Sequence, residues 1–585
     1  MLPGDNIVLA NDIKNRFSPA ITLSFILLLV GILYCLYYGR IGYMPQDHST
    51  VFDGGWRILS GQVPFHDFTL PNAILPIYLQ AFIFKLFGIN WFVYCLHAAI
   101  FNGLFCVLVF FFLRIFGGTL RLSFFYALLS GVVFYTPFGI PVQDQHAYFF
   151  TFLLIFLACL SIRVSRPLLK QLIFISLPVV TVSAFLSKQI PTIFGAALVG
   201  AILLVAERRN LIALARSLLA GTLAASLSLW ALYHILGIDF ELLKVYFFQL
   251  PAETGRDRMA WVISRNFADT IEYMISHWQL FSPFALVTML FLGGTLLVCL
   301  RFIISGTRPH WKALGRRMEK HLFPLFLAQL FLLICFLFVI LTNNQRENGV
   351  PLIFISLGLT HLFLQGVWGQ DRSNDPTIRS LRQRSVLSLM SFILVGSSLW
   401  CAWNFDRRVN ATRMVHDFIY KKKANEGPQQ EKPGALSFLV WGAPKSYRGT
   451  PEHFLRIVDF FQRHTGNFYL LGDSSVLYAL TGRPSVNPVL WFHPGETLPR
   501  AGSPLFPAFQ DRLMEALRKY RVRYIVIEGS RAAPYNFTWS KVNLAYFPAL
   551  DDLVQKKGHE LEHFGPFTII ELIMPFDTDP AGNRK

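Results

Sequence analysis

Charged residues are scarce in this 585-residue sequence: Asp, Glu, Lys and Arg make up 15% of it, whereas hydrophobic residues make up 53%. A soluble globular domain contains about 25% charged residues, so this composition excludes a purely soluble fold. Several apolar runs reach roughly 18 to 22 residues, which is the length that crosses a hydrocarbon core of about 30 Å. The sequence therefore predicts a polytopic α-helical membrane protein, with enough additional length for a soluble domain.

Metal, nucleotide and repeat motifs are also missing. None of the seven cysteines belongs to a CxxC pair, and all lie in or at the edge of apolar runs, so a zinc or thiol-redox site is not expected. The LLGDSS stretch at 470–475 lacks the Gly-Lys pair of a P-loop, and no repeat of fixed period occurs. The first apolar run has no small-x-small cleavage site, so it is expected to remain as a membrane helix.

The net charge of +18 comes mainly from short loops between apolar runs. These loops contain Arg163, Arg166 and Lys170; Arg208, Arg209 and Arg216; Arg308, Lys312, Arg316, Arg317 and Lys320; and Arg372, Arg379, Arg382 and Arg384. Cytoplasmic loops of membrane proteins carry an excess of Lys and Arg, and a cytoplasmic N-terminus would place all of these loops in the cytoplasm. The charge is therefore interpreted as a topology signal, and no nucleic-acid partner is expected.

Apolar runs and loop charges together predict about eleven spans, with the N-terminus inside and the C-terminus outside. They lie near residues 18–39, 90–113, 119–138, 146–163, 171–187, 190–206, 211–236, 279–300, 321–342, 350–367 and 386–403. The first outer loop, 40–89, contains two amphipathic stretches that are expected to form interfacial helices. Residues 237–278 form a second long outer loop.

The composition changes after residue 403, which ends the predicted transmembrane domain of residues 1–403. Residues 404–435 are interpreted as a polar linker, because KKKANEGPQQEKPGA contains Gly and Pro among charged residues. Beyond it, short β-branched or aromatic runs (SFLVW, NFYLLG, RYIVIEG and FTIIEL) alternate with amphipathic helical patterns. Residues 436–585 are therefore expected to form a soluble α/β domain on the outer face.

The predicted topology collects ionisable side chains at the outer membrane boundary. The acidic ones are Asp47, Asp53, Asp67 and Asp144, and the basic ones are Lys188, Arg256, Arg258, Arg265 and Arg346. Ionisable groups at membrane depth are costly, which makes them candidates for function. Cations could hold an anionic lipid headgroup while a carboxylate activates a nucleophile. The alternative is a set of solvated interfacial charges without a catalytic role.

One stretch of the first outer loop carries a more specific pattern. Residues 47–68 read DHSTVFDGGWRILSGQVPFHDF, and IYLQAFIFKLFG follows at 77–88. An Asp after the first span, followed by an amphipathic segment that ends in G-x-x-P-[FY]-x-D-F, resembles the first outer loop of GT-C glycosyltransferases. That superfamily includes protein O-mannosyltransferases, lipid A aminoarabinose transferases and family 39 or RgtA/B/C/D-like bacterial proteins. The resemblance extends over residues 18–403 in span number and orientation.

What the resemblance implies is the transfer of a sugar from a polyprenyl-phosphate donor to an acceptor hydroxyl at the outer face. The acidic residue just after the first span is the base in these families, and it corresponds to Asp47. Asp47 would accept the acceptor's proton while the lipid phosphate leaves from the opposite side, with inversion. A second family carboxylate corresponds to Asp144, which would position the acceptor or the base. An N-cap of the fourth span is an equally good interpretation of Asp144.

The sequence departs from some relatives at the expected phosphate site. Those relatives carry a Lys-Pro-Pro motif in the first loop, whose lysine contacts the lipid phosphate, whereas this chain has LPNAILP at 70–76. Arg and Lys both suit a leaving phosphate. The first candidates are therefore Arg256 and Arg258, followed by Arg346 and Lys188.

Other polar residues of the outer loops are candidates for substrate binding, with simpler alternatives beside them. They are Asp53, for which capping or solvation is the alternative; His146, which could cap the fourth span; and His48. Asp67 is expected to form a turn. His48 beside Asp47 is a poor chelate without an accompanying His cluster, so no metal or other cofactor is favoured, although a divalent ion is an open alternative.

These features together predict an inverting GT-C glycosyltransferase, multi-pass in the bacterial cytoplasmic (inner) membrane, with its active site on the outer face. Its expected partners are a polyprenyl-phosphate sugar donor, membrane lipid, and a glycan, lipid or protein acceptor. A transporter or flippase is the alternative, and it predicts midplane charges and pseudo-repeated halves, neither of which the sequence shows. A scaffold whose α/β domain binds a partner is a further alternative.

Overall fold

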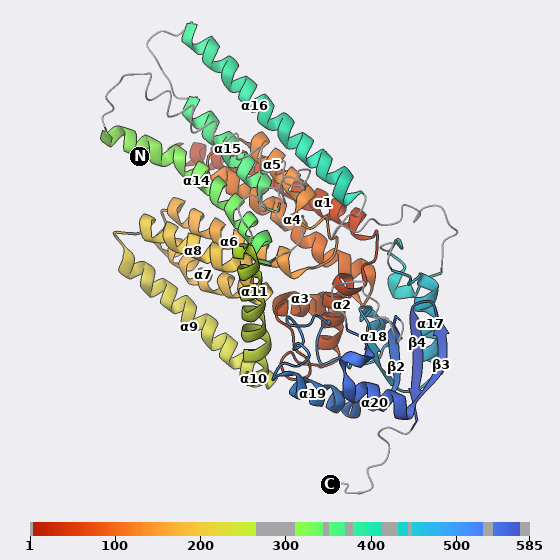
Figure 1. The fold of residues 1–585 in the computed structure, drawn as a ribbon. Helices are drawn as coiled ribbons and strands as arrows, with labels where there is room; N and C mark the ends of the chain where they lie inside the picture. The colour runs from red at the N-terminus through yellow and green to blue at the C-terminus, as the bar shows by residue number, and fades with distance from the viewer. Residues whose placement is uncertain are drawn as a thin grey trace.

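The computed structural model describes residues 4–264, 311–342, 350–368, 378–411, 431–442, 447–529 and 542–573. A bundle of long helices carries a small α/β domain at one of its ends (Figure 1). One hydrophobic core lies within the bundle, and another joins the first long loop to the α/β domain. The chain is thus a polytopic helical membrane protein with a C-terminal α/β domain, as its composition predicted.

Ten helices within the described residues coincide with ten of the eleven predicted spans. They are α1 (Gly4–Gly39), α4 (Trp91–Ile115), α5 (Leu120–Val133), α6 (Gln143–Arg163), α7 (Pro167–Ser187), α8 (Gln189–Ala206), α9 (Leu211–Leu236), α14 (Trp311–Thr342), α15 (Ile353–Trp368) and α16 (Ile378–Phe405). Seven of the described helices are long and apolar enough to cross a membrane, whereas α5, α14 and α15 contribute shorter apolar segments. The remaining predicted span, 279–300, lies outside the described residues.

Local sequence explains where several of these helices begin. Asn90 accepts a hydrogen bond from the main-chain N–H of Val93 at 3.0 Å, and Thr119 accepts one from Leu122 at 3.2 Å. Asn and Thr are favoured N-cap residues, because their side-chain oxygens satisfy main-chain donors that have no partner within the helix. The extended backbone of Lys188 separates α7 from α8, so the predicted break after Leu186 occurs.

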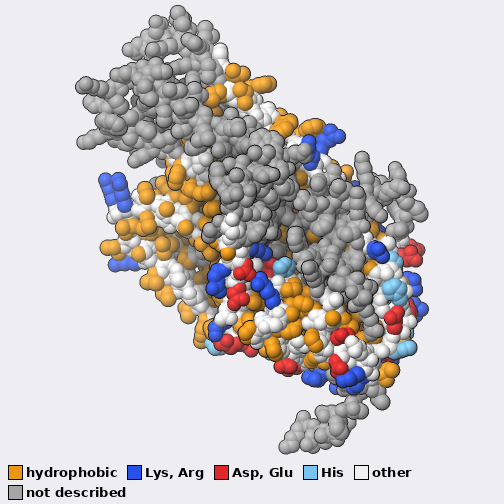
Figure 2. Space-filling view, in the orientation of Figure 1, with side chains coloured by type: hydrophobic (Ala, Val, Ile, Leu, Met, Phe, Trp, Pro, Cys, Tyr) orange, Lys and Arg blue, Asp and Glu red, His pale blue; other side chains and the backbone are white. Residues whose placement is uncertain are grey.

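The alternating direction of the helices gives the bundle two different ends. We call the end near Ile41 the domain end, because Ile41 pairs there with Val440 of the C-terminal region in an isolated β-bridge. The opposite end, where α6 finishes at Arg163 and the 207–210 loop joins α8 to α9, is called the basic end. Figure 2 shows hydrophobic side chains over α7 to α9, with Lys and Arg side chains at the end farthest from the α/β domain. This apolar face is what a lipid-exposed surface requires.

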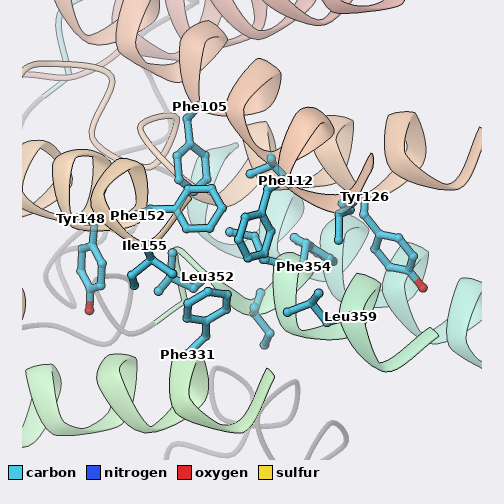
Figure 3. Close-up of a cluster of buried hydrophobic side chains, with 14 of the residues drawn as sticks. Phe105, Phe112, Tyr126, Tyr148, Phe152, Ile155, Phe331, Leu352, Phe354 and Leu359 are labelled. Atoms are coloured by element: carbon cyan, nitrogen blue, oxygen red, sulfur yellow. The ribbon is translucent and has the colours of Figure 1, made fainter. Parts of the chain in front are cut away.

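Aromatic side chains fill the centre of the bundle (Figure 3). The ring of Phe112 on α4 lies 4.9 Å from Phe152 on α6 and 5.8 Å from Phe331 on α14, measured between centroids. Elsewhere the backbones of α1 and α4 approach so closely that a Cβ on Gly103 would lie 2.5 Å from the carbonyl oxygen of Leu28. Small residues at such contacts are typical of packing between membrane helices.

The first long loop, residues 40–89, forms two helices at the domain end, α2 (Pro45–Leu59) and α3 (Ile74–Phe87). Both expected amphipathic stretches are therefore helical. Most of α2 is buried, and its Trp56 indole donates a 2.9 Å hydrogen bond to the carbonyl of Arg483 in the α/β domain. The second long loop forms α10 (Phe240–Leu243), a π-helical turn (Lys244–Gln249) and α11 (Leu250–Ser264).

The C-terminal domain is built on a four-stranded sheet in the order β1-β2-β4-β3. Its elements are α17 (Pro451–Arg463), β1 (Asn467–Leu471), α18 (Val476–Thr481), α19 (Phe506–Lys519), β2 (Val522–Glu528), α20 (Pro548–Lys557), β3 (Gly558–Phe564) and β4 (Phe567–Leu572). β1 and β2 are parallel, and the other neighbours are antiparallel. The domain lies against α2 and α3 at the end of the bundle (Figure 1).

Two sequence expectations for this domain are wrong. SFLVW was expected to be a strand, but only Val440 within it makes a β-bridge, because its partner is the short segment after α1 and not the sheet. The strand β3 was missed, because GHELEHF alternates glutamates and histidines without an apolar face and occupies the exposed edge of the sheet.

The LLGDSS stretch supplies a turn whose amides hold a carboxylate of the same domain. The main-chain N–H groups of Asp473 and Ser474 donate to Oε2 of Glu528 at 2.7 and 2.9 Å. The Ser474 and Tyr447 hydroxyls donate to its other oxygen at 2.6 and 2.8 Å. This turn therefore completes the domain core and does not bind phosphate.

Candidate active site

Asp47 lies in the first turn of α2, just beyond the end of α1 at the domain end. Pro45 starts the helix with its fixed φ angle, and an acidic side chain in a first turn is favoured by the helix dipole. Asp47 is partly exposed, whereas His48 beside it is buried. The Asp47 carboxylate interacts electrostatically with the buried Tyr94 of α4. The Asp47 carboxylate is thus partly open to solvent at the start of α2.

Asp144 and Lys188 form an ion pair at the same end of the bundle. Nζ of Lys188 lies 2.5 Å from Oδ1 of Asp144, and the side chains are 14% and 6% exposed respectively. Asp144 occupies the first turn of α6, but Val142 is the N-cap residue and no side chain caps that helix. The N-cap interpretation of Asp144 is therefore wrong, because its carboxylate points to Lys188 and not back to the helix start.

The segment that replaces the Lys-Pro-Pro motif lies directly beside Lys188. The main-chain N–H of Ala73 donates to the carbonyl of Ser187 at 2.9 Å, and the Gln189 side chain donates to the carbonyl of Pro71 at 3.0 Å. These bonds join the 70–76 loop to the residues on both sides of Lys188. The 70–76 loop contains no lysine of its own, but Lys188 lies beside it in the folded chain.

Two tyrosines lie near the carboxylates. Tyr94 is close to Asp47 and to Tyr135, and Tyr135 is close to Asp144. Neither tyrosine was singled out from the sequence. Both come from apolar stretches, in which a Tyr reads as one more hydrophobic residue. Asp47 and Asp144 thus each have a buried tyrosine nearby.

Two buried polar atoms near these residues lack a hydrogen-bond partner within the described protein. They are Oδ1 of Asn72 and Nε1 of Trp91. Buried polar groups in folded proteins are nearly always paired, and leaving one unpaired costs about 1–3 kcal/mol. Such a collection is what a site for a polar ligand provides.

His146 belongs to a buried chain of hydrogen-bonding groups and does not cap α6. Its Nε2 lies 3.0 Å from Nε2 of His97, and Nδ1 of His97 lies 2.9 Å from Oε1 of Gln80 on α3. The Tyr135 hydroxyl bonds to the other ring nitrogen of His146. One nitrogen of the facing pair must donate and the other accept, so at least one of the rings is neutral. The capping alternative for His146 is wrong.

One arginine of α11 contacts the C-terminal domain. Arg258 lies 3.2 Å from Glu496, and the neighbouring Asp257 lies 2.7 Å from Arg500. Arg256 is exposed. The predicted phosphate ligand Arg258 thus pairs with the α/β domain, whereas Lys188 pairs with a predicted site carboxylate. Arg346 lies outside the described residues, as does Arg265.

Asp53 joins α2 to the C-terminal domain. It is fully buried, its Oδ2 accepts from Nε of Arg57 at 2.8 Å, and its Oδ1 accepts from the Ser485 hydroxyl at 2.5 Å. Arg57 donates further to the carbonyl of Asn487 at 2.8 Å. Neither capping nor solvation describes Asp53, because Met44 is the N-cap of α2 and no part of the side chain reaches solvent. Both carboxylate oxygens have protein partners.

Asp67 forms the expected turn. Its Oδ2 accepts from the main-chain N–H of Val63 at 2.8 Å, and its Oδ1 lies 2.7 Å from Nζ of Lys519 on α19. Burial raises the pKa of the Asp67 carboxyl, but the hydrogen bonds from Lys519 and Val63 outweigh it, so the pKa lies below its ordinary value. Within the described residues no group of three or more His, Cys, Asp or Glu side chains is placed to hold a metal ion.

Known protein families and curated proteins give no match to the sequence. The structure is similar to ArnT from Cupriavidus metallidurans bound to undecaprenyl phosphate, with a TM-score of 0.46 and 11% identity over 98% of this chain and 100% of that one. The Archaeoglobus fulgidus oligosaccharyltransferase, in complex with Zn and sulfate, has a TM-score of 0.43 and 10% identity over 93% of this chain and 73% of its own.

ArnT, a lipid A aminoarabinose transferase, and the oligosaccharyltransferase are both GT-C glycosyltransferases, the superfamily that the first outer loop of this chain resembles. At these identities and TM-scores, the chemistry of this protein has to be inferred from its own residues.

Proposed function

We propose that this protein is an inverting membrane glycosyltransferase that moves a sugar from a polyprenyl-phosphate donor to an acceptor at the domain end of the bundle. The observation that carries the proposal is the buried Asp144–Lys188 ion pair beside the 70–76 loop, at the same end of the bundle as the partly exposed carboxylate of Asp47. A single displacement at an anomeric carbon needs a base on one side and a cation for the leaving phosphate on the other.

Asp47 serves as the general base in this proposal. Its carboxylate accepts the proton of the acceptor hydroxyl as that oxygen bonds to the anomeric carbon. The bond from the anomeric carbon to the phosphate oxygen breaks on the opposite side, and its electron pair leaves with the lipid phosphate. The configuration at the anomeric carbon inverts because attack and departure occur on opposite faces.

Lys188 serves as the phosphate-binding cation. It lies beside the 70–76 loop, and Asp144 holds its ammonium group in place before the donor binds. An ammonium that is already largely desolvated forms strong charge-assisted hydrogen bonds with a phosphate oxygen. Asp144 then positions Lys188, and the unpaired polar atoms of Asn72 and Trp91 are available to sugar hydroxyls.

The α/β domain covers this region and is proposed to face the side of the inner membrane away from the cytoplasm. The excess of Lys and Arg at the basic end of the bundle supports that orientation. Sugars linked to polyprenyl phosphate are bulky and polar, so the acceptor reaches them from the aqueous side, where the Asp47 carboxylate is partly exposed.

The positions of charged residues favour an enzyme over a transporter. Within α4, α6, α7 and α8, Asp, Glu, Lys and Arg occur only in the first or last turns. Transporters place their coupling groups near the bilayer midplane, commonly in broken helices. The carboxylates, lysines and arginines of these spans lie instead at the membrane boundary, where a lipid-linked headgroup would react.

The proposal is tested by native mass spectrometry of the purified protein with added undecaprenyl phosphate. Wild-type protein is expected to retain this lipid, and Lys188→Gln is expected to weaken retention at least about ten-fold, because a charge-assisted hydrogen bond is lost. The matched control is Lys244→Gln, which removes an exposed lysine paired with Glu241 on the protein surface. No retention by the wild type, or equal loss in both variants, would contradict the proposal.

A further inference from the structure

A large apolar cavity lies between α6, α8 and α14. Its volume is about 1230 Å³, and its walls include Cys159, Phe194, Leu198, Phe326 and Leu333. That volume exceeds the roughly 300–1,000 Å³ of an ordinary small-molecule pocket. None of its lining residues belongs to the groups discussed above, although Leu337 of its wall is adjacent to Phe338, whose ring lies 5.2 Å from Nζ of Lys188.

The cavity opens sideways to the bilayer and has the depth of one leaflet. Several large wall residues are exposed on the bundle surface, among them Phe326 (56%), Leu333 (47%) and Val205 (74%). Along α8 the wall runs from Phe194 to Ala206, which at 1.5 Å per residue is roughly 18 Å. Half of a hydrocarbon core is about 15 Å. Acyl chains of a single leaflet therefore match this depth.

Two arginines stand at the basic end of the cavity. Arg163 and Arg208 both line it, and both side chains are exposed. The acidic neighbour Glu207 is buried and lies 2.5 Å from Nζ of Lys170, so its charge is already balanced. Within the described part of the chain, no carboxylate forms an ion pair with either arginine. An apolar cavity thus ends in uncompensated positive charge at headgroup depth.

We propose that this cavity binds one anionic phospholipid of the leaflet at the basic end. Its acyl chains occupy the space between α6, α8 and α14, and Arg163 and Arg208 hold its phosphate. Guanidinium groups suit this role, because their donors match phosphate oxygens in a two-pronged geometry. The proposed phosphate position is separate from that of the donor phosphate: Asp144 and Arg163 are nineteen residues apart along α6, which is roughly 28 Å.

The test measures binding of phosphatidylglycerol and phosphatidylcholine to the full-length protein by native mass spectrometry. Phosphatidylglycerol is expected to bind, and the double variant Arg163→Gln/Arg208→Gln is expected to bind it about ten-fold or more weakly. The matched control, Arg166→Gln/Arg209→Gln, removes two neighbouring arginines that do not line the cavity. Equal affinity for both lipids, or equal loss in both double variants, would overturn the proposal.

A second variant separates the phospholipid from the isoprenoid tail of the donor. Ala201 lines the cavity and is exposed, so Ala201→Trp fills space without disturbing a buried core. It is expected to reduce phosphatidylglycerol binding while retention of undecaprenyl phosphate stays unchanged. Loss of undecaprenyl phosphate with intact phosphatidylglycerol binding would assign the cavity to the donor tail and refute the phospholipid. Lys188→Gln should leave phosphatidylglycerol binding unchanged. Failure of the glycosyltransferase proposal can therefore be distinguished from failure of the phospholipid proposal.

Discussion

Nζ of Lys188 lies 2.5 Å from Oδ1 of Asp144, although Asp144 lies in the first turn of α6 and Lys188 at the junction of α7 and α8; both side chains are mostly buried. Transfer of charged groups out of water is costly, and removing one partner of such a pair leaves the other uncompensated. The pair therefore makes a specific prediction about how its two members share stability and substrate binding.

Asp144→Asn and Lys188→Gln are each expected to destabilise the protein, by about 2 kcal/mol, because each leaves a charged partner with a weakened hydrogen bond. The double variant should be less unstable than the sum of the two, since neither charge then remains. Thermal unfolding of the three variants in detergent measures this coupling. Strictly additive stabilities would show that the pair is not coupled. In the same variants, undecaprenyl phosphate binding should be lost in Lys188→Gln and retained in part in Asp144→Asn.

Asp47→Asn is expected to lower the rate of sugar transfer at least about 100-fold, because the amide cannot accept the acceptor's proton. Donor binding should persist, since the change lies on the acceptor side of the proposed displacement. The measurement compares kcat for transfer with retention of undecaprenyl phosphate by the same preparation. A variant that transfers sugar at the wild-type rate would remove Asp47 from the mechanism.

Arg57→Met is expected to loosen the α/β domain from α2, because it leaves the fully buried Asp53 without its cation. Such a loss costs about 3–5 kcal/mol. Asp53→Leu combined with Arg57→Met should recover part of that loss, since no buried charge remains. Hydrogen exchange across residues 483–490, which contact α2 through Ser485 and Asn487, reports the loosening. Unchanged exchange in Arg57→Met would show that other contacts suffice.

Asp67 is expected to make the stability of the folded protein depend on pH in the acidic range. Its pKa in the folded protein is lowered, so the unfolded chain binds the proton more readily. The stability from Asp67 is therefore fully present above the unfolded pKa of about 3.9 and is lost as the pH falls through the folded value. Because Lys519 is half-exposed, the contribution of the pair is about 1 kcal/mol or less.

The corresponding experiment follows unfolding of the wild type and of Asp67→Asn from pH 7 to pH 3. The difference between them is expected near neutral pH and should vanish in acid. Asp552→Asn serves as control, because its partner Lys556 lies on the same helix and both side chains are exposed. A difference between wild type and Asp67→Asn that persists in acid would assign the effect to the Val63 turn and not to the charge.

The length of the apolar runs was sufficient to predict where the membrane helices lie. A run such as 190–206 has to bury its backbone polar groups within itself, and a helix is the one local structure that does so in lipid. Basic loops predicted the orientation of the spans for a related reason: a charged side chain is costly in lipid, so each charge stays near water. The amphipathic patterns of residues 451–464 and 509–520 likewise predicted α17 and α19.

The partners of the ionisable residues followed from tertiary structure alone. Asp53 and Ser485 are 432 positions apart, and Asp144 meets Lys188 across two helices. Sequence spacing describes which residues share a face of one element, but these contacts arise where separate elements pack together. Burial then decides what each charge does: it converts Asp53 into a link between domains and brings Lys188 to the loop that lacks a lysine. The composition thus predicted that the chain is a membrane protein. Only the packing of separate helices and loops decided which charged residues lie together.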